Sequence, residues 1–226
     1  MIIEPIGHIK CDFKEKFGVP RQSGLANTSA EIVFLPEFGS PDAFRGLEGF
    51  SHIWLLWGFD RIEKQSVSLT VRPPRLGGNI RMGVFATRSP FRPNHIGLSL
   101  VEITGIEVRK GQGTVIKISG ADLCDNTPIY DIKPYLPTVE SKPFAKGGFA
   151  KQREKYRLKV EIPPKIAVNI SNSTVCEIEQ ILSGDPRPSY HDDPQRVYKM
   201  VYGRLEVSFM VEKSVLKVVD ICEKLG

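Results

Sequence analysis

The sequence predicts a mainly β protein, in which an antiparallel β-barrel-like N-terminal domain precedes a small α+β C-terminal domain. Three observations lead to this prediction. Short apolar segments of strand length, separated by turns that contain Gly or Pro, recur through the first two-thirds of the chain. A segment rich in Lys and Arg but poor in large aliphatic residues then interrupts the pattern. Beyond it, one helix signal precedes three further strand-like segments.

The composition also predicts where the chain divides. A length of 226 residues suits one generous domain with a smaller one attached. We expect residues 1–140 to form the barrel domain, residues 141–159 to form a basic linker, and residues 160–226 to form the C-terminal domain.

The first elements are short. Residues 5–10 and 30–35 are β-like, and the stretch 18–28 between them is rich in turn formers. Residues 41–47 place Pro at the start of a predicted helical turn. Residues 51–59 form a continuous apolar run that is too short to cross a membrane, so we expect a buried core strand.

The next segments predict a hairpin and a last barrel strand. Residues 98–108 and 113–119 are β-rich, and they flank a turn signal at residues 109–112. Residues 129–134 supply another short strand. Repeated strands of this kind favour an antiparallel barrel or sandwich.

The C-terminal segment reads as one helix and three strands. The polar residues 171–174 form an N-cap signal before an amphipathic helix at 175–182, which ends near Gly184. The strand-like segments are residues 197–202, 205–211 and 216–222.

Several chemistries are disfavoured by what the sequence lacks. Its four Cys and four His are dispersed and form no Cys-x-x-Cys pair, so we expect neither a metal site nor a Cys–His nucleophile. The first residues do not resemble a signal peptide, and no membrane span is expected, so we expect a cytoplasmic protein. Because Gly-x-Gly-x-x-Gly and Walker A motifs are absent, a nucleotide-like cofactor should bind outside a Rossmann fold. A net charge of +5 is compatible with a nucleic-acid partner.

The most informative segment is residues 83–97, a strand-like run that breaks at two Arg and two Pro. No Asp or Glu occurs between Lys64 and Val101, although six cationic residues do: Lys64, Arg72, Arg75, Arg81, Arg88 and Arg92. The prolines fix φ and extend the residues before them, so Arg88 and Arg92 should project from a stiff loop. Stiffness lowers the entropic cost of binding an anion. The alternative is an ordinary solvated basic loop.

Two other segments concentrate polar chemistry. Residues 122–135 carry three carboxylates, a Lys and two Tyr, which suit ribose hydroxyls or a ligand ammonium group. The alternative there is an Asx turn in which Asp125 bonds its own backbone. Residues 184–190 hold Arg187 between two prolines, and Arg can pair with phosphate or stack on a base. The alternative is a rigid connector.

Together these segments resemble the TrmO (TsaA-like) family of S-adenosylmethionine-dependent tRNA methyltransferases. The matching pieces are Pro20-Arg21-Gln22 with Gly24, and residues 45–54, 72–79, 85–97, 131–135 and 185–190. They span nearly the whole chain. The resemblance implies a homodimer that methylates N6 of threonylcarbamoyladenosine at tRNA position 37, beside the anticodon.

The resemblance also implies a cofactor pocket for S-adenosylmethionine. The corresponding residues here are Arg21, Gln22, Ser23, Asp60, Arg61, Arg88, Leu98, Asp122, Leu123, Cys124 and Asp125. Two positions depart from the family pattern, since Asp60 stands where a His is common and Asn126 where a Gly is common. Asn can still occupy a left-handed turn.

The chemistry of methyl transfer predicts which other groups matter. A sulfonium needs an in-line nucleophile and little covalent help, so positioning supplies most of the acceleration. N6 of the modified adenosine is a poor nucleophile, so a base near N6–H would help. The candidates for this catalytic role are Lys133, Tyr135, Asp185 and Tyr190, and the sequence does not choose among them. Arg92 and Arg187, with the basic linker, should hold anticodon-loop phosphates.

Two other functions stay open. One is a non-catalytic β-barrel module that binds RNA or a nucleotide through the same Arg-rich loop. The other is an S-adenosylmethionine enzyme that acts on a different small substrate.

Overall fold

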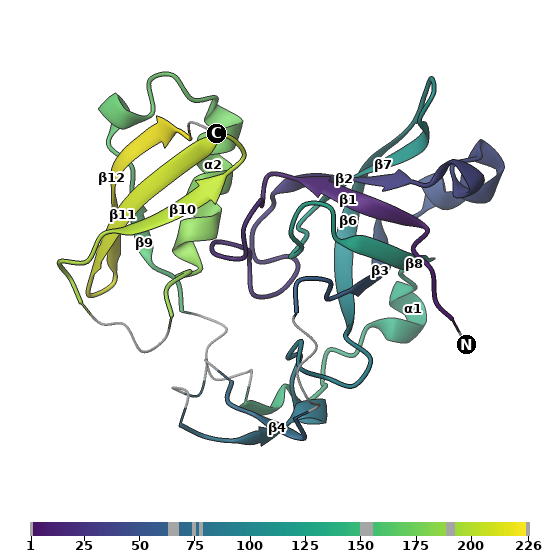
Figure 1. The fold of residues 1–226 in the computed structure, drawn as a ribbon, viewed down its shortest axis with the longest axis horizontal. Helices are drawn as coiled ribbons and strands as arrows, with labels where there is room; N and C mark the ends of the chain where they lie inside the picture. Colours follow the sequence, from purple (N-terminus) through teal and green to yellow (C-terminus); the bar gives the residue numbers. More distant parts are fainter. Residues whose placement is uncertain are drawn as a thin grey trace.

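The computed structural model describes residues 2–62, 68–73, 76, 79–149, 156–188 and 193–224. A closed six-stranded barrel lies beside a smaller four-stranded sheet (Figure 1). This arrangement confirms the predicted mainly β fold. The predicted domain limits stay a proposal. A third, two-stranded sheet pairs β4 (Thr70–Val71) with β5 (Met82–Gly83).

The barrel closes through antiparallel pairs in the order β1-β2-β7-β6-β3-β8. Its strands are β1 (Gly7–Cys11), β2 (Ser29–Phe34), β3 (His52–Gly58), β6 (Ile96–Arg109), β7 (Gly113–Ser119) and β8 (Pro128–Pro134). Each overlaps a segment that the sequence predicts as a strand. Closure leaves no open edge except where one strand runs past its neighbour.

Alternation along the strands fills the barrel. On β3, Ile53, Leu55 and Trp57 point into the core, whereas Trp54 and Leu56 point outward. Burial of each such large apolar side chain stabilises the fold by about 1.5–3 kcal/mol. The apolar run at residues 51–59 is therefore a core strand, as predicted.

Short helical turns connect the barrel strands: η1 (Pro36–Phe38), η2 (Pro41–Phe44), η3 (Leu47–Gly49) and η5 (Val84–Ala86). Two more follow the barrel: α1 (Pro137–Glu140) comes directly after β8, and η7 (Pro164–Ile166) lies in the C-terminal part. The helical turn predicted at 41–47 is thus present as η2. The strand-like interpretation of residues 83–86 is wrong beyond Gly83, because Val84 turns inward and is buried.

The C-terminal part packs one helix on a sheet. Its elements are β9 (Lys159–Glu161), α2 (Asn172–Ser183), β10 (Tyr198–Tyr202), β11 (Leu205–Glu212) and β12 (Val215–Glu223), in the sheet order β10-β11-β12-β9. The hydroxyl of Ser171 caps α2 by accepting the Thr174 N–H at 3.1 Å. Strand β9 is parallel to β12 and starts at the last residue of the predicted linker.

The two parts share a core. Phe13 and Ala26, from loops of the barrel, are buried in the cluster formed by α2 and its sheet. The Phe13 ring meets Tyr202 edge-on at 5.2 Å. The α2 side chain Gln180 also accepts the Asn27 N–H at 2.8 Å, so the helix faces the barrel. In the described parts of the chain, no helix has the length and apolar character needed to span a membrane.

Glu177 joins the two parts through one carboxylate. Its Oε1 accepts hydrogen bonds from the Ser29 N–H at 3.0 Å and the Ser29 hydroxyl at 2.9 Å. Its Oε2 accepts the Tyr202 hydroxyl at 2.8 Å. A carboxylate thus satisfies donors from the barrel and from the C-terminal sheet at once.

We predict that Glu177→Ala lowers the free energy of unfolding by about 2–3 kcal/mol, because it leaves the buried Tyr202 hydroxyl without its acceptor and removes the acceptor of both Ser29 donors. Denaturant titration measures this loss. The control is Glu179→Ala, since Glu179 is exposed on the same helix and should change stability by no more than about 0.5 kcal/mol. Equal losses in the two variants would contradict the role of Glu177.

Candidate functional site

The candidate site is built on an unpaired edge of β6. Strand β7 pairs with β6 only from Glu102 onward, so residues 96–101 have β3 on one side and no strand on the other. The Leu100 N–H, on this edge, donates to the Ser23 hydroxyl at 3.2 Å. Because N–H directions alternate along a strand, the N–H and C=O of Leu98 point to the same edge. No described residue bonds either group.

The loop that contains Gln22 and Ser23 runs along this edge. The Gln22 side-chain oxygen accepts a hydrogen bond from Arg88 Nη1 at 2.7 Å. The next residues anchor the loop, since Ser23 binds β6 and the Gly24 N–H donates to the Gly120 carbonyl at 2.9 Å. The Arg88 loop and the Gln22 loop, 66 positions apart, therefore meet beside β6.

A buried hydrogen-bonded chain supports the same edge from inside the barrel. The Trp57 indole N–H donates to Ser99 Oγ at 2.9 Å, and the Ser99 hydroxyl donates to the Asp122 carboxylate. Gly97 lies directly opposite Trp57. A Cβ on Gly97 would fall 2.2 Å from an indole carbon, so only Gly lets the indole lie against β6.

Asp122 is a partly buried carboxylate of the site. Burial raises its pKa above the ordinary value, although the Ser99 hydroxyl and the nearby Arg88 cation act in the opposite direction. Its ionised form therefore carries an unfavourable desolvation cost that a cationic ligand group would reduce.

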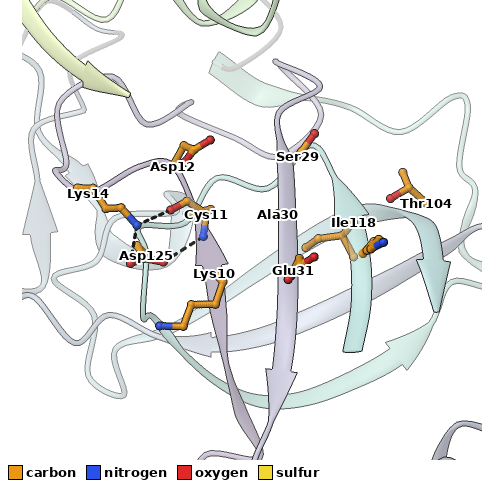
Figure 2. Close-up of a pocket in the computed structure, with 11 residues that line it drawn as sticks. Lys10, Cys11, Asp12, Lys14, Ser29, Ala30, Glu31, Thr104, Ile118 and Asp125 are labelled. Carbon is orange, nitrogen blue, oxygen red and sulfur yellow. Dashed lines mark hydrogen bonds and ion pairs between the residues drawn. The ribbon is translucent and has the colours of Figure 1, made fainter. Parts of the chain in front are cut away.

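A second group of charges surrounds Asp125, which follows Asp122 by three positions. Arg61 donates Nη2 to the Asp125 carbonyl at 2.7 Å and Nη1 to the Lys14 carbonyl at 2.8 Å. The Lys14 ammonium binds the Asp125 carboxylate at 2.8 Å and the Cys11 carbonyl at 3.0 Å (Figure 2). Burial alone would raise the pKa of Asp125, but Lys14 and the Cys11 N–H hold it below its usual range.

A cavity of about 440 Å³ opens beside Asp125 on the outer face of β1, β2 and β7. Figure 2 shows its charged lining, which comprises Lys10, Asp12, Lys14, Glu31 and Asp125, with Lys117. These charges are largely neutralised, since Lys14 pairs with Asp125, Glu31 with Arg109 and Lys117 with Glu107. The cavity shares Lys14 and Asp125 with the group of charges that Arg61 holds.

Burial disfavours the thiolate form of both thiols at the site. It raises the pKa of Cys11 to about 12 and also raises the pKa of Cys124. A raised pKa favours the protonated thiol, which is the weaker nucleophile. Among the described residues, no group of three or more His, Cys, Asp or Glu is placed to hold a metal ion.

The structure arranges most of the residues expected to bind a cofactor in two groups, which adjoin along the segment 122–125. Contacts or charge interactions connect Gln22, Ser23, Arg88 and Asp122 in the first group, and Asp60, Arg61, Cys124 and Asp125 in the second. Leu98 lies on the free edge of β6 and Leu123 is buried in the barrel core, whereas Arg21 binds carbonyls of the C-terminal part. This donor set fits S-adenosylmethionine in its chemistry. It offers a guanidinium for a carboxylate, carboxylates for an ammonium group or ribose hydroxyls, and a free strand edge for a base.

Lys133 and Tyr135 lie on the outer face of the barrel. The register places Leu100, Trp54 and Lys133 side by side on β6, β3 and β8, so Lys133 stands two strands, or about 10 Å, from Leu100. Lys133 is exposed and pairs with Asp131 at 2.8 Å. The Tyr135 ring packs edge-on against Trp54 at 6.1 Å.

The arginines expected to hold phosphates are engaged within their own loops. Arg92 donates to the carbonyls of Thr87 at 3.0 Å and Ser89 at 3.4 Å, so it braces the loop that presents Arg88. Arg187 is only 8% exposed and forms two bonds to Asp185. Tyr190 lies outside the described residues.

Sequence reasoning missed Trp57, Ser99 and Lys14. A signal for Ser99 exists, because it shares its inward parity with Val101 on an otherwise apolar face and a polar side chain there needs a partner. Lys14 carries no comparable signal, since its contact with Asp125 spans 111 positions.

Comparisons with known proteins give a consistent result. Residues 8–141 match the family described as the tRNA-methyltransferase O N-terminal domain, and residues 155–224 match the TrmO C-terminal domain. The chain is 43% identical over 194 residues to the tRNA (adenine(37)-N6)-methyltransferase of Escherichia coli (strain K12). The alignment covers 83% of this chain and 82% of that protein.

Two further relatives cover almost the whole chain. A Pseudomonas aeruginosa (strain PAO1) protein named as a putative S-adenosylmethionine-dependent methyltransferase, RcsF, is 38% identical over 237 aligned positions, covering 97% of this chain and 96% of the relative. The crystal structure of TrmO from Pseudomonas aeruginosa superposes with a TM-score of 0.78 at 32% identity, covering 98% of each chain.

We predict that Asp122→Asn raises the melting temperature at pH 7 and that the difference shrinks as the pH falls. The folded-state pKa of Asp122 is raised, so its stabilising contribution is full below about pH 4 and is lost as the pH rises through the folded-state pKa. Thermal melts between pH 4 and 8 measure the difference. A variant that is less stable than the wild type at pH 7 would contradict this electrostatic account.

Proposed function

The chain belongs to the TrmO family of tRNA methyltransferases, and we propose that it transfers a methyl group from S-adenosylmethionine to N6 of threonylcarbamoyladenosine at position 37 of tRNA. One observation carries the proposal. Loops far apart in the sequence converge on the free edge of β6, and they bring the Gln22–Arg88 contact next to Asp122. A structural barrel alone needs no such convergence.

The cofactor residues divide by chemistry. When bound, S-adenosylmethionine supplies an electrophilic methyl group on a sulfonium. We assign Arg88 to the methionine carboxylate, because Gln22 fixes its guanidinium and Arg pairs well with carboxylates. Asp122 suits the ammonium group, and the free N–H and C=O of Leu98 suit the edge of the adenine ring.

The remaining cofactor candidates support this arrangement in other ways. Arg61 holds the Asp125 segment in place through its carbonyl, and Asp60 is exposed beside it. Arg21 contacts the C-terminal part of the chain through the carbonyls of Asp185 and Arg187. Leu123 packs in the barrel core beneath the loop.

The acceptor adenosine needs a group near N6–H. Of the four candidates, Lys133 and Tyr135 share the outer barrel face with the side chain of Leu98, so they suit a base bound over that face. Both carboxylate oxygens of Asp185 already accept bonds from Arg187, which makes it a weaker candidate for a base. Tyr190 stays a candidate from the sequence alone.

Exposed cations of the predicted linker are our candidates for tRNA phosphates. Lys142 and Lys146 are exposed, and the salt dependence of tRNA binding would measure how many phosphates such residues contact. Arg157 is excluded, because its guanidinium binds the Leu25 carbonyl at 2.9 Å and the Ser183 hydroxyl at 3.1 Å. A tRNA substrate is consistent with action in the cytoplasm.

We also propose that the protein is a homodimer. Apolar side chains are exposed beside the site, with Leu98 47%, Leu136 44% and Val139 59% accessible. A second copy seated there would bury them and would enclose Lys133 and Tyr135 between the two chains. Sedimentation velocity should therefore give twice the mass of one chain, and Leu136→Asp should shift it to the monomer. A wild-type monomer would overturn the proposal.

We predict that Arg88→Ala weakens S-adenosylmethionine binding by roughly 10- to 100-fold while the fold stays intact, since Arg88 is exposed and its loss removes charge-assisted hydrogen bonds. Calorimetry measures the affinity. The control is Arg81→Ala in the same basic run, which bonds the Thr70 hydroxyl on β4 and should bind like the wild type. Unchanged affinity of the Arg88 variant would remove Arg88 from the pocket.

Mass spectrometry of nucleosides tests the function itself. Transfer RNA that carries threonylcarbamoyladenosine should gain one methyl group on that nucleoside when incubated with the protein and S-adenosylmethionine. Cofactor binding without methylated tRNA would favour an enzyme for another substrate. Absence of cofactor binding would favour a non-catalytic binding module.

A further inference from the structure

We propose that the Asp185–Arg187 ion pair is a positioning device for the methyl-donor site, which it controls through Arg21. The inference rests on the proposed function, because it concerns the site that would hold the methyl donor. It assigns Arg187 to the cofactor side of the reaction instead of to the tRNA.

In the ion pair, the Arg187 guanidinium binds both carboxylate oxygens of Asp185. Arg187 donates Nε to Asp185 Oδ1 at 2.8 Å and Nη2 to Asp185 Oδ2 at 3.0 Å, which makes a two-pronged contact. The Arg187 side chain is 9% and the Asp185 side chain 16% exposed. The Tyr156 hydroxyl lies 3.4 Å from the same carboxylate. A guanidinium held in this way is poorly placed to reach a phosphate.

The pair also fixes the backbone. Asp185 has a φ of 51°, a left-handed conformation that non-Gly residues adopt only when their surroundings hold them there. Pro186, the next residue, fixes its own φ. The ion pair between the Asp185 and Arg187 side chains closes a ring over residues 185–187. This ring therefore determines where the carbonyl groups of Asp185 and Arg187 point.

Those carbonyl groups point at Arg21. Arg21 Nη2 donates to the Arg187 carbonyl at 2.9 Å and to the Asp185 carbonyl at 3.3 Å, across 166 and 164 positions of sequence. The two residues after Arg21 are Gln22, which holds Arg88, and Ser23, which holds β6. Three consecutive residues thus connect the C-terminal loop, the Arg88 loop and the free strand edge.

The consequence is that the C-terminal part sets the geometry of the donor site without touching the donor. If the ion pair is broken, the two carbonyl groups lose their fixed direction and Arg21 loses its hydrogen bonds to them. The Gln22 side chain then no longer holds Arg88 in one position, and the cofactor must order the loop when it binds.

The test measures S-adenosylmethionine affinity and loop protection in the full-length chain. We expect Arg187→Ala to raise the dissociation constant roughly tenfold or more and to speed hydrogen–deuterium exchange of residues 20–24 in the cofactor-free protein. Asp185→Asn keeps the shape but removes the charge, and it serves as the second variant if Arg187→Ala does not fold. Arg187→Lys, which restores charge but not the two-pronged contact, should recover only part of the affinity.

A double-mutant cycle identifies the route. If Arg187 acts through Arg21, then Arg21→Ala combined with Arg187→Ala binds no more weakly than the weaker single variant. Effects that multiply would overturn the proposal. The matched control is Lys199→Ala, which breaks an exposed ion pair with Glu206 on the C-terminal sheet and should leave both measurements unchanged.

Two further outcomes separate the proposals from each other. Wild-type affinity and wild-type exchange in the Arg187 and Asp185 variants, with weaker tRNA binding, would show that Arg187 serves the tRNA and would overturn the positioning role. If the wild type itself binds no S-adenosylmethionine, the proposed function fails, whereas faster exchange of residues 20–24 in the variants alone would still support the connection to Arg21.

Discussion

The unpaired edge of β6 is the constraint on which the rest of the site depends. Backbone N–H and C=O groups need partners, and a strand that runs past its neighbour leaves them open. Here β7 stops pairing at Glu102, so the loop that contains Ser23 binds the open edge at Leu100, while Asp122 binds Ser99 from inside the barrel. Within the described part of the chain, the backbone groups of Leu98 stay open, and they give the barrel a place for the edge of a ligand.

The sequence predicts this fold well where the apolar residues follow a regular strand or helix period, and poorly where they do not. The barrel strands and α2 follow from alternation and from the Ser171 cap. Strand β9 is only three residues long and lies in a basic segment. It forms by pairing with β12, so its own sequence carries no recognisable strand pattern. The turn at Val84 is likewise tied to burial, since Val84 is only 1% exposed.

For the site, the sequence predicted which types of side chain are present better than it predicted where those side chains point. The stiffness of the Arg-rich loop, which its prolines predict, stays a prediction, and Arg92 adds hydrogen bonds to the carbonyls of Thr87 and Ser89. Arg187 between its prolines turns to Asp185 rather than to solvent. Sequence gives the charge of a side chain, whereas the path of the loop decides where the charge goes. The cofactor set came from the family resemblance, because contacts such as Gln22 with Arg88 cross 66 positions.

The shared core has a consequence for how the protein is made. The barrel can close once Pro134 has been synthesised, but Phe13 and Ala26 belong to a core whose last strand, β12, ends at Glu223. At ordinary rates of translation, the 89 intervening positions take roughly 5 to 20 s. During that time a nascent barrel carries uncovered apolar side chains, Phe13 before Arg21 and Ala26 after it. Chaperone occupancy on ribosome-bound chains should therefore be concentrated in this interval and end when β12 emerges.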